Sequence, residues 1–415
     1  MVLVEGVTGF AAASYATDPA LLAELRVAWP VADDRGVITG VDENGSRPTD
    51  LAHAVLDGAI LLTDRLAVAM AVDAAGDGSY IVIPLVREGG RWRSARAGDG
   101  LSAFVAGVPM ASERAIGVDQ TNESVVVGER VIVKWFRRVG PGPSRAATLI
   151  AHLNAVGFGG MPPPLGSVTW RSPGGVDLTL AQGDAFLPGA RDGWEWCVEL
   201  VPDDASIGSA LGELVGRLHH SLATPSAVIG EPVASAAPGD VARWRQEALA
   251  ALEQARATEP SLEPLVSAMR RVLDELPSDR PIAIQPVHGD LHVGQVLEWP
   301  GGFSVIDFDG NPAIGSEANA VRQPRERDIA QMLMSLDHVG RIVDHRSGWT
   351  MTVTIDAWIA ATRAGFLAAT GPVDEEVLAA FEVEQECREV LYASRFLPRW
   401  RYAPMATLEA RFSAR

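Results

Sequence analysis

Two short stretches of the chain hold side chains that are suited to transferring a phosphoryl group. The first, PVHGDLHVGQVL from residue 286, contains Asp290 and, five positions later, Gln295. The second, VIDFDGNP from residue 305, contains Asp307. An aspartate can take the proton of an attacking hydroxyl, and amide and carboxylate oxygens are ligands that suit Mg²⁺. The pattern predicts Asp290 as a base, with Gln295 and Asp307 as metal ligands.

The spacing of these residues is that of a kinase site. Kinase catalytic loops place an Asp, four residues and then an Asn ahead of a DFG triplet. Here the amide stands at the same distance from Asp290 but belongs to Gln295, and the triplet that begins at Asp307 is DFD. The order of the three groups therefore favours a kinase, with two changes of residue type.

A kinase also needs a cation near the phosphates of its nucleotide. The run VIVKWF alternates apolar residues around Lys134, as a strand does when one of its faces is buried. No GxGxxG precedes it, but the polar turn DQTNES does. Asn122 and Ser124 in this turn offer backbone N–H groups and short side chains to phosphate oxygens. We therefore predict that Lys134, Asn122 and Ser124 bind the nucleotide.

The elements expected around these residues change in type along the chain. Residues 1 to about 110 are typical of an α+β unit, with a hairpin predicted in SYIVIPLVREGGRWRSA. The runs SVVV and RVIVKWF predict two strands joined by Gly-Glu, and SRAATLIAHLNAVGF a helix capped by Ser144. Residues 114–188 thus indicate a small, mostly antiparallel lobe with one helix. Most of the remaining sequence has helical periodicity.

Length and composition exclude several classes of protein. With 415 residues the chain can form two or three domains, and its formal net charge of −18 argues against nucleic-acid binding. Its two cysteines, Cys197 and Cys387, form neither a disulfide framework nor a zinc site. The N-terminus lacks the features of a signal peptide, and no apolar run is long enough to span a bilayer. We therefore expect a cytoplasmic enzyme or binding protein with no nucleic-acid or membrane partner.

The motifs together resemble the aminoglycoside-phosphotransferase-like small-molecule kinases, which are related to protein kinases. The closer likeness is to bacterial maltokinases, in QTNESVVVGERVIVKWFRR, DGWEW, HGDLHVGQVL, IDFDGNP, RERDIAQMLMSLDH and YASRFLPRWRYAP. The likeness extends over residues 80 to 410. A group of actinobacterial glucosamine kinases is similar in architecture and shares the HGDLH…Q pattern.

The resemblance implies an α+β fold, namely a two-lobed protein-kinase-like fold with an added N-terminal α+β cap subdomain. Its domains would be the cap at 1–112, a small nucleotide-binding lobe at 113–188 and a mostly helical C-terminal lobe at 189–415. The C-terminal lobe would carry the catalytic loop and the acceptor site. ATP and Mg²⁺ are the cofactors that the resemblance implies.

The resemblance also implies roles for individual residues. Lys134 would contact the nucleotide phosphates, and Asp290 would be the catalytic base. Arg327 and Asp328 would brace the catalytic loop. The hinge that reads adenine would run through Gln182, Ala185 and Leu187, and the magnesium ligands would be Gln295, Asp307 and Asp309.

The sequence departs from the family pattern in two places. These kinases usually carry a Glu on the helix after the lysine strand, where it pairs with the Lys. The helix predicted in SRAATLIAHLNAVGF has no acidic residue, and Thr148 takes that position. Lys134 would then pair either with Asp307 or with phosphate only. Near the C-terminus, Leu397-Pro398-Arg399 precedes Trp400 where maltokinases tend to have Arg-Pro.

The acceptor is predicted to bind to the helical lobe. His292 follows Asp290 closely enough to reach a sugar hydroxyl, or else makes a structural hydrogen bond. Glu382, Glu386 and Glu389 have helical spacing and form one acidic face, which is either a solvated face with only Glu389 turned inward or part of the acceptor site. Trp400 either stacks on the sugar or packs in the core.

An acidic pocket would favour an amino sugar over a neutral one, because carboxylates bind an ammonium group. We therefore expect a kinase that converts glucosamine to glucosamine 6-phosphate, with Asp290, His292, Glu386, Glu389 and Trp400 at the acceptor. The alternatives are a maltokinase, an aminoglycoside phosphotransferase and a degenerate pseudokinase that serves as a binding module. A monomer or weak homodimer is expected.

Overall fold

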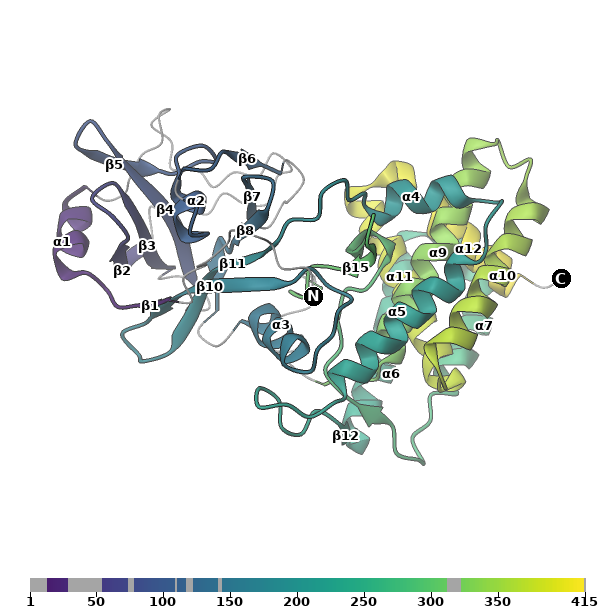
Figure 1. The fold of residues 1–415 in the computed structure, drawn as a ribbon. Helices are drawn as coiled ribbons and strands as arrows, with labels where there is room; N and C mark the ends of the chain where they lie inside the picture. Colours follow the sequence, from purple (N-terminus) through teal and green to yellow (C-terminus); the bar gives the residue numbers. More distant parts are fainter. Residues whose placement is uncertain are drawn as a thin grey trace. The chain divides into compact units, whose positions relative to one another are not determined.

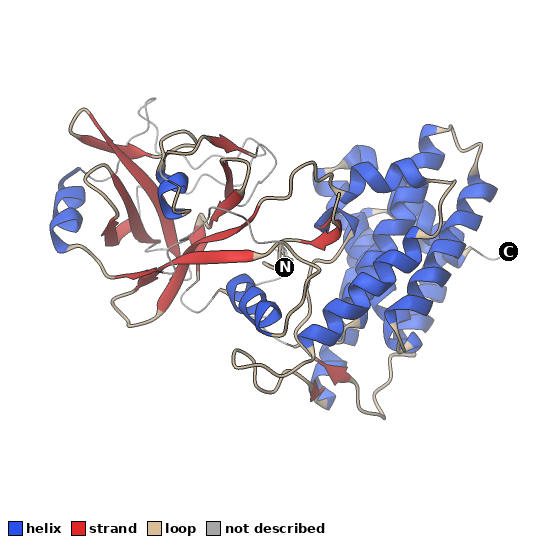
Figure 2. Cartoon of the chain, viewed as in Figure 1, coloured by secondary structure: helices blue, strands red, loops and turns tan. Residues whose placement is uncertain are grey.

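The computed structural model describes residues 13–28, 54–73, 78–108, 110–116, 122–140, 144–311 and 322–413. The chain divides into two compact units. Unit 1 comprises Met1–Ala151 and Pro162–Pro188, and unit 2 comprises His152–Met161 and Gly189–Arg415. Strands dominate the first unit and helices the second (Figures 1 and 2).

Six of the described strands form one sheet in unit 1, in the order β1-β10-β11-β8-β7-β6. Strand β1 runs parallel to β10, and the other neighbours are antiparallel. The bounds are β1 Ala13–Tyr15, β6 Glu113–Ala115, β7 Glu123–Val127, β8 Val131–Trp135, β10 Pro164–Arg171 and β11 Asp177–Ala185.

The predicted hairpin that carries the lysine strand is confirmed. Strands β7 and β8 pair in antiparallel fashion, and Gly128 and Glu129 between them have φ values of 57° and 53°. Two successive positive φ values are what a two-residue hairpin turn requires. Val131, Val133 and Trp135 of β8 enter the core of unit 1, so Ile132 and Lys134 belong to the opposite face of the sheet.

A second sheet in unit 1 is formed by five of the described strands. It has the order β2-β3-β4-β5, and β9 also pairs with β4. Their bounds are β2 Ala54–Leu61, β3 Leu66–Asp73, β4 Tyr80–Glu88, β5 Arg91–Ser94 and β9 Arg138–Val139. The predicted β4–β5 hairpin is therefore present, with Gly89 and Gly90 at positive φ in its turn.

The pairing of β9 with β4 joins two regions that the sequence assigned to different domains. Val139 lies opposite Tyr80 in this sheet, although a boundary was expected between residues 112 and 113. Both regions belong to unit 1. A cap subdomain at 1–112 that is distinct from the nucleotide lobe at 113–188 stays a prediction.

Three helices begin in unit 1: α1 Pro19–Ala28, α2 Leu101–Val105 and α3 Arg145–Ala155. The predicted cap of α3 is confirmed, because the Ala147 N–H donates to Ser144 Oγ at 3.3 Å. Gly157 follows the helix with a φ of 77°, the left-handed conformation that commonly ends a helix.

In the part of unit 2 that the structure describes, long helices are accompanied by two short pairs of strands and three short 3₁₀ turns. Helix α5 lies against α10, where a Cβ added at Gly208 would lie 2.1 Å from the Thr362 carbonyl oxygen. The helices are α4 Gly193–Leu200, α5 Ile207–Leu222, α6 Pro238–Thr258, α7 Glu263–Asp274, α9 Glu326–Arg346, α10 Thr352–Thr370, α11 Glu375–Phe396 and α12 Tyr402–Phe412. Short 3₁₀ turns are η2 Pro260–Leu262, η3 Val293–Gln295 and η4 Pro398–Trp400, and the short strands are β12 Ala234–Ser235, β13 Ala283–Ile284, β14 Val296–Trp299 and β15 Gly302–Val305.

Candidate functional site

The buried carboxylate of Asp328, in the first turn of α9, holds in place the loop His288–Asp290, here called the HGD loop. Its Oδ2 accepts the backbone N–H of His288 at 2.7 Å, and its Oδ1 accepts that of Gly289 at 2.8 Å. His219 Nε2 lies 3.0 Å from Oδ2. Burial alone would raise the pKa of Asp328, but the hydrogen bond from His219 and those from the backbone hold this pKa below its usual value. The predicted bracing role of Asp328 thus matches its contacts.

His288 is fully buried and supports the loop from inside. Its Nε2 lies 2.8 Å from the carbonyl oxygen of Ile306, which can only accept a hydrogen bond. Its Nδ1 accepts the backbone N–H of Asp290 at 3.3 Å. These partners assign the proton to Nε2. They tie the HGD loop to the strand end that carries Asp307.

The carboxylate of Asp290 is half-buried and is oriented by helix α9. Its Oδ1 accepts a hydrogen bond of 2.6 Å from Gln331 Nε2, and its Oδ2 lies 3.9 Å from His292 Nε2. The hydrogen bond to Gln331 occupies one carboxylate oxygen. Oδ2 is the oxygen on the His292 side, and it is the better placed of the two to accept a proton from a hydroxyl.

His292 has both a structural contact and a place beside Asp290. Its Nδ1 accepts the N–H of Gly294 at 3.1 Å and so caps η3, and its ring lies 5.9 Å from that of Trp194. Burial lowers the pKa of His292, although Asp290 and Glu389 act in the opposite sense. A Cβ at Gly294 would lie 2.6 Å from Trp194 Nε1, so a side chain there would displace these rings.

The three predicted metal ligands lie just before and just after the hairpin of β14 and β15. Gln295 ends η3 just before β14, and Asp307 and Asp309 follow β15. The backbone N–H of Ile306 donates to the Gln295 carbonyl oxygen at 2.9 Å, which brings the two ends together. Asp307 has a φ of 64°, an uncommon conformation for a residue other than glycine and one that is found at functional sites.

In unit 1, three predicted nucleotide-binding residues form a row across the sheet. Ser124 of β7 and Gln182 of β11 lie directly opposite Lys134 of β8, one on each side. Residues directly opposite in neighbouring strands share a face, so the three side chains leave the sheet on the side away from the core. Asn122, just before β7, is buried like Ser124.

The predicted hinge residues extend from the end of β11. The Ala185 N–H donates to the Pro163 carbonyl oxygen at 2.9 Å, and Leu187 is buried. Between Gln182 and Ala185, the half-buried Asp184 accepts a hydrogen bond of 3.2 Å from Gln182 Nε2. Burial raises the pKa of Asp184 to about 7, against the effects of Gln182 and Lys134. The reading of adenine by this stretch stays a prediction.

The acidic stripe of α11 is largely buried, so its interpretation as a solvated face is wrong. Glu382 binds Arg363 and Arg411, the latter at 2.6 Å, and both Glu382 and Glu386 are almost fully inaccessible to solvent. Glu389 is half-buried. Burial raises the pKa of Glu389, His338 and His292 lower it, and Asp290 raises it. Among the three glutamates, Glu389 is therefore the one that interacts electrostatically with Asp290 and His292.

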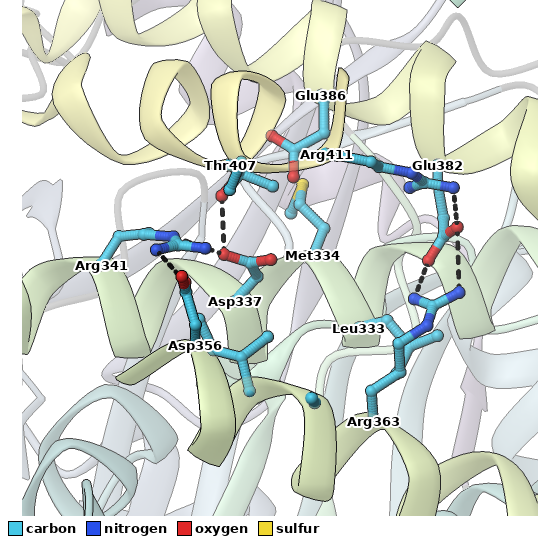
Figure 3. A pocket seen from close by; sticks show the side chains of 13 residues that line it. Leu333, Met334, Asp337, Arg341, Asp356, Arg363, Glu382, Glu386, Thr407 and Arg411 are labelled. Atoms are coloured by element: carbon cyan, nitrogen blue, oxygen red, sulfur yellow. Dashed lines mark hydrogen bonds and ion pairs between the residues drawn. The ribbon is translucent and has the colours of Figure 1, made fainter. Parts of the chain in front are cut away.

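Glu386 is paired with His338 of α9, at 3.0 Å between Oε2 and Nε2. It also lines a pocket of about 290 Å³ among α9, α10, α11 and α12, which Figure 3 shows with its ion pairs. Asp290 and His292 do not line this pocket. Burial alone would lower the pKa of His338, but Glu386, Glu389 and Asp337 raise it to about 9.

The His338–Glu386 pair predicts a pH dependence of stability. The pKa of His338 is raised from the ordinary 6.5 to about 9, so the proton that folding retains on His338 makes a contribution to stability that is lost as the pH rises from 6.5 through 9. Burial raises the pKa of Glu386 to about 7, so both members of the pair are charged only between about pH 7 and 9. We expect the free energy of unfolding to fall by on the order of 2 kcal/mol over this window. Denaturant titrations of His338→Gln should show a flatter profile, with exposed His220→Gln as the control. An unchanged slope in His338→Gln would contradict this assignment.

Two residues with predicted roles, Arg327 and Trp400, have their contacts away from the HGD loop. Arg327 binds Glu384 at 3.0 Å and lies over the ring of Phe381 on α11, instead of bracing the loop. Trp400 is 42% exposed and stacks near Tyr402, which itself stacks on His345 at 3.8 Å. His345 is 14 residues after Gln331 on α9, or about 21 Å along the helix axis. The structure therefore does not bring Trp400 to the loop that holds Asp290.

Sequence reasoning missed three residues that contact this loop. Gln331 orients Asp290, Ser335 Oγ accepts the Val293 N–H at 3.0 Å, and Trp194 packs on His292. Gln331 and Ser335 follow Asp328 at helical spacing, which is the signal that could have identified them.

Among the residues that the structure describes, no three His, Cys, Asp or Glu side chains gather as a metal centre. Gln295 is not one of these four residue types. None of the helices that the structure describes combines the length and apolar composition that a membrane crossing needs.

Comparison with known proteins agrees with the motifs and the geometry. A model of the phosphotransferase enzyme family matches residues 113–382. A glucosamine kinase of Streptacidiphilus jiangxiensis is 38% identical over 393 residues, which cover 82% of this chain and 87% of that protein. A glucosamine kinase of Mycolicibacterium smegmatis is 34% identical over 385 residues, covering 83% and 95%.

The fold also matches solved structures. A glucosamine kinase in complex with glucosamine, ADP and inorganic phosphate has a TM-score of 0.72 and 35% identity, covering 86% of this chain and 93% of that one. The expected kinase-like α+β fold is confirmed by this match, and the expected enzyme class by the family. The chain belongs to the phosphotransferase enzyme family, whose members transfer phosphate to a hydroxyl acceptor.

Proposed function

We propose that this protein is a Mg²⁺- and ATP-dependent kinase that phosphorylates glucosamine to glucosamine 6-phosphate. The observation that carries the proposal is the constellation around Asp290, whose carboxylate is oriented by Gln331 and faces His292. The similarity to glucosamine kinases over more than four fifths of the chain supports the choice of sugar. Because ATP is the donor, we place the reaction in the cytoplasm.

Asp290 would act as the general base toward the acceptor hydroxyl. Gln331 donates to Oδ1 and keeps the carboxylate from rotating, so Oδ2 would accept the proton as the hydroxyl oxygen attacks the γ-phosphorus. The bond from the γ-phosphorus to the β–γ bridging oxygen would break, and ADP would leave. Asp328 fixes the backbone on which Asp290 stands through its bonds to His288 and Gly289. Positioning of this kind supplies much of the catalysis in phosphoryl transfer.

Gln295, Asp307 and Asp309 would hold Mg²⁺. One amide and two carboxylate oxygens form a hard donor set that fits this ion, and the hydrogen bond from Ile306 to Gln295 joins the segments that carry them. Bound magnesium would neutralise charge on the phosphate oxygens. The row of Ser124, Lys134 and Gln182, with Asn122 beside it, would bind the nucleotide in unit 1.

The acceptor's ammonium group would be bound by Glu389. This carboxylate is half-buried on α11, and the charges of Asp290 and His292 both act on its pKa. Glu386 is less suited, because its charge is already compensated by His338 at 3.0 Å. An amino sugar is therefore favoured over a neutral sugar of the same shape.

The test of the proposed function is a coupled assay of ADP release with Mg-ATP. Glucosamine, maltose, glucose and an aminoglycoside are compared at equal concentrations. Strong preference for glucosamine supports the proposal. Preference for maltose would make the protein a maltokinase, and absence of turnover on all four would leave the pseudokinase alternative standing.

A substitution at Glu389 tests how the amino sugar is recognised. We expect Glu389→Gln to raise the KM for glucosamine about tenfold, because one partly buried charge pair is lost. Its KM for Mg-ATP and its weak activity on glucose should hardly change. Exposed Glu375→Gln on the same helix is the control. Equal losses on glucosamine and glucose would show that Glu389 has only a structural role.

A further inference from the structure

Asp184 lies close to Lys134 on the same face of the sheet. In the β11–β8 register, Gln182 is opposite Lys134 and Asp184 is opposite Ile132. Alternate residues of a strand share a face, so Asp184 is the diagonal neighbour of Lys134. Such diagonal neighbours lie about 7 Å apart, a distance that the long side chain of a lysine spans easily.

The side chain of Gln182 fixes the orientation of the Asp184 carboxylate. Its Nε2 donates to Asp184 Oδ1 at 3.2 Å and to the Gly183 carbonyl oxygen at 3.3 Å. Because Gln182 is buried directly opposite Lys134, this contact keeps the carboxylate beside the lysine strand. The carboxyl group is therefore held by the sheet itself and does not depend on a loop.

The helix that follows the lysine strand supplies no acid of its own. Helix α3 contains neither Asp nor Glu, and its Thr148 hydroxyl donates to the Ser144 carbonyl oxygen at 2.9 Å. A lysine that binds phosphates benefits from a fixed carboxylate, which restrains its flexible stem in the binding orientation. Asp184 meets this requirement from β11.

We propose that Asp184 is a positioning residue that holds the ammonium group of Lys134 in place for the nucleotide phosphates. The proposal rests on the proposed function, because it assumes that Lys134 binds those phosphates. It concerns nucleotide binding alone and is independent of which sugar is the acceptor.

The ionisation of Asp184 gives the proposal a pH signature. Burial raises the pKa of this carboxyl to about 7, while Lys134 on β8 and Gln182 on its own strand act against that rise. On the other side, β10 places the uncharged Pro164 opposite Asp184. The carboxylate is therefore lost as the pH falls through 7, so nucleotide affinity should weaken over that range in the wild type but not in Asp184→Asn.

The experiment measures the Kd of the full chain for Mg-ADP by titration calorimetry, without any sugar. We expect Asp184→Asn to raise this Kd about tenfold and Asp184→Glu to recover most of the affinity. In a Lys134→Ala background, Asp184→Asn should have no further effect. The matched control is Asp177→Asn, an exposed position on the same strand that pairs with Arg171.

An unchanged Kd in Asp184→Asn would overturn the proposal, and so would an equal rise in the Lys134→Ala background. If Asp184→Asn did not fold, the loss of wild-type affinity below pH 7 and the Asp184→Glu variant would still decide. Failure of the proposed function has a different signature, namely Mg-ADP binding to the wild type without turnover of any acceptor.

Discussion

Asp290→Asn is expected to lower kcat by about three orders of magnitude, because an amide cannot take the proton of the acceptor hydroxyl. The Gln331 side chain can still hydrogen-bond the amide oxygen, so the loop should keep its shape. The Kd for Mg-ADP and the thermal unfolding midpoint should therefore stay close to those of the wild type. Steady-state kinetics at saturating substrates measure the effect.

The matched control for this variant is Asp279→Asn, which removes a carboxylate from an exposed position of the same unit. It should leave kcat unchanged. Activity of Asp290→Asn within about threefold of the wild type would remove Asp290 as the base, since loss of a general base costs at least about 100-fold. A large loss accompanied by unfolding would instead assign Asp290 a structural role.

Asp328→Asn should have the second large effect, on stability and activity together. The buried carboxylate accepts two backbone N–H groups and contacts His219, and an amide would turn a donor toward at least one of them. Breaking a buried pair of this kind costs about 3 kcal/mol. The midpoint of urea unfolding should fall accordingly, and kcat should fall because the loop that carries Asp290 is released.

Exposed Asp274→Asn, at the end of α7, is the control for a lost aspartate charge in unit 2. The lowered pKa of Asp328 also predicts the direction in which stability changes with pH. Its contribution to stability is present above the ordinary carboxyl range and is lost only as the pH falls through the folded-state pKa. Unchanged unfolding and kcat in Asp328→Asn would show that the loop does not depend on this carboxylate.

The parts of the site that were predictable depend on local sequence. Gln295 and Asp307 are separated only by a short hairpin, so their spacing alone indicated that they lie together. The lysine strand was equally clear, because the alternation around Lys134 and the Gly-Glu turn specify a hairpin and its inward face. The register that places Ser124 and Gln182 beside Lys134 follows from strand pairing, which the sequence does not display.

The predictions that the structure does not support concern residues whose partners lie far away in the chain. Glu382 is charged and has helical spacing, so its burial could not be seen without Arg363 and Arg411, which lie on other helices. Trp400 has the type of a sugar-stacking residue, but its aromatic neighbours Tyr402 and His345 fix it elsewhere. Tertiary packing decided each of these cases.

The proposed positioning of Lys134 by Asp184 uses a neighbour that the family pattern did not suggest. The absence of an acid from α3 leaves the pattern incomplete, while Asp184 lies beside Lys134 on the neighbouring strand. The pairing of β11 with β8 is what makes a carboxylate at position 184 a neighbour of the lysine.

The oligomeric state is a separate matter. The expectation that the protein is a monomer or a weak homodimer stays a prediction.

The most direct test of the central claim is to identify the product made from Mg-ATP and glucosamine by the wild-type protein. Phosphorus and proton NMR of the reaction mixture should show one ADP for each phosphate monoester, with the new phosphorus coupled to the two protons at C6 of the sugar. That result is the one we predict. Release of ADP and inorganic phosphate with unchanged glucosamine, or a phosphate on another position, would contradict the account.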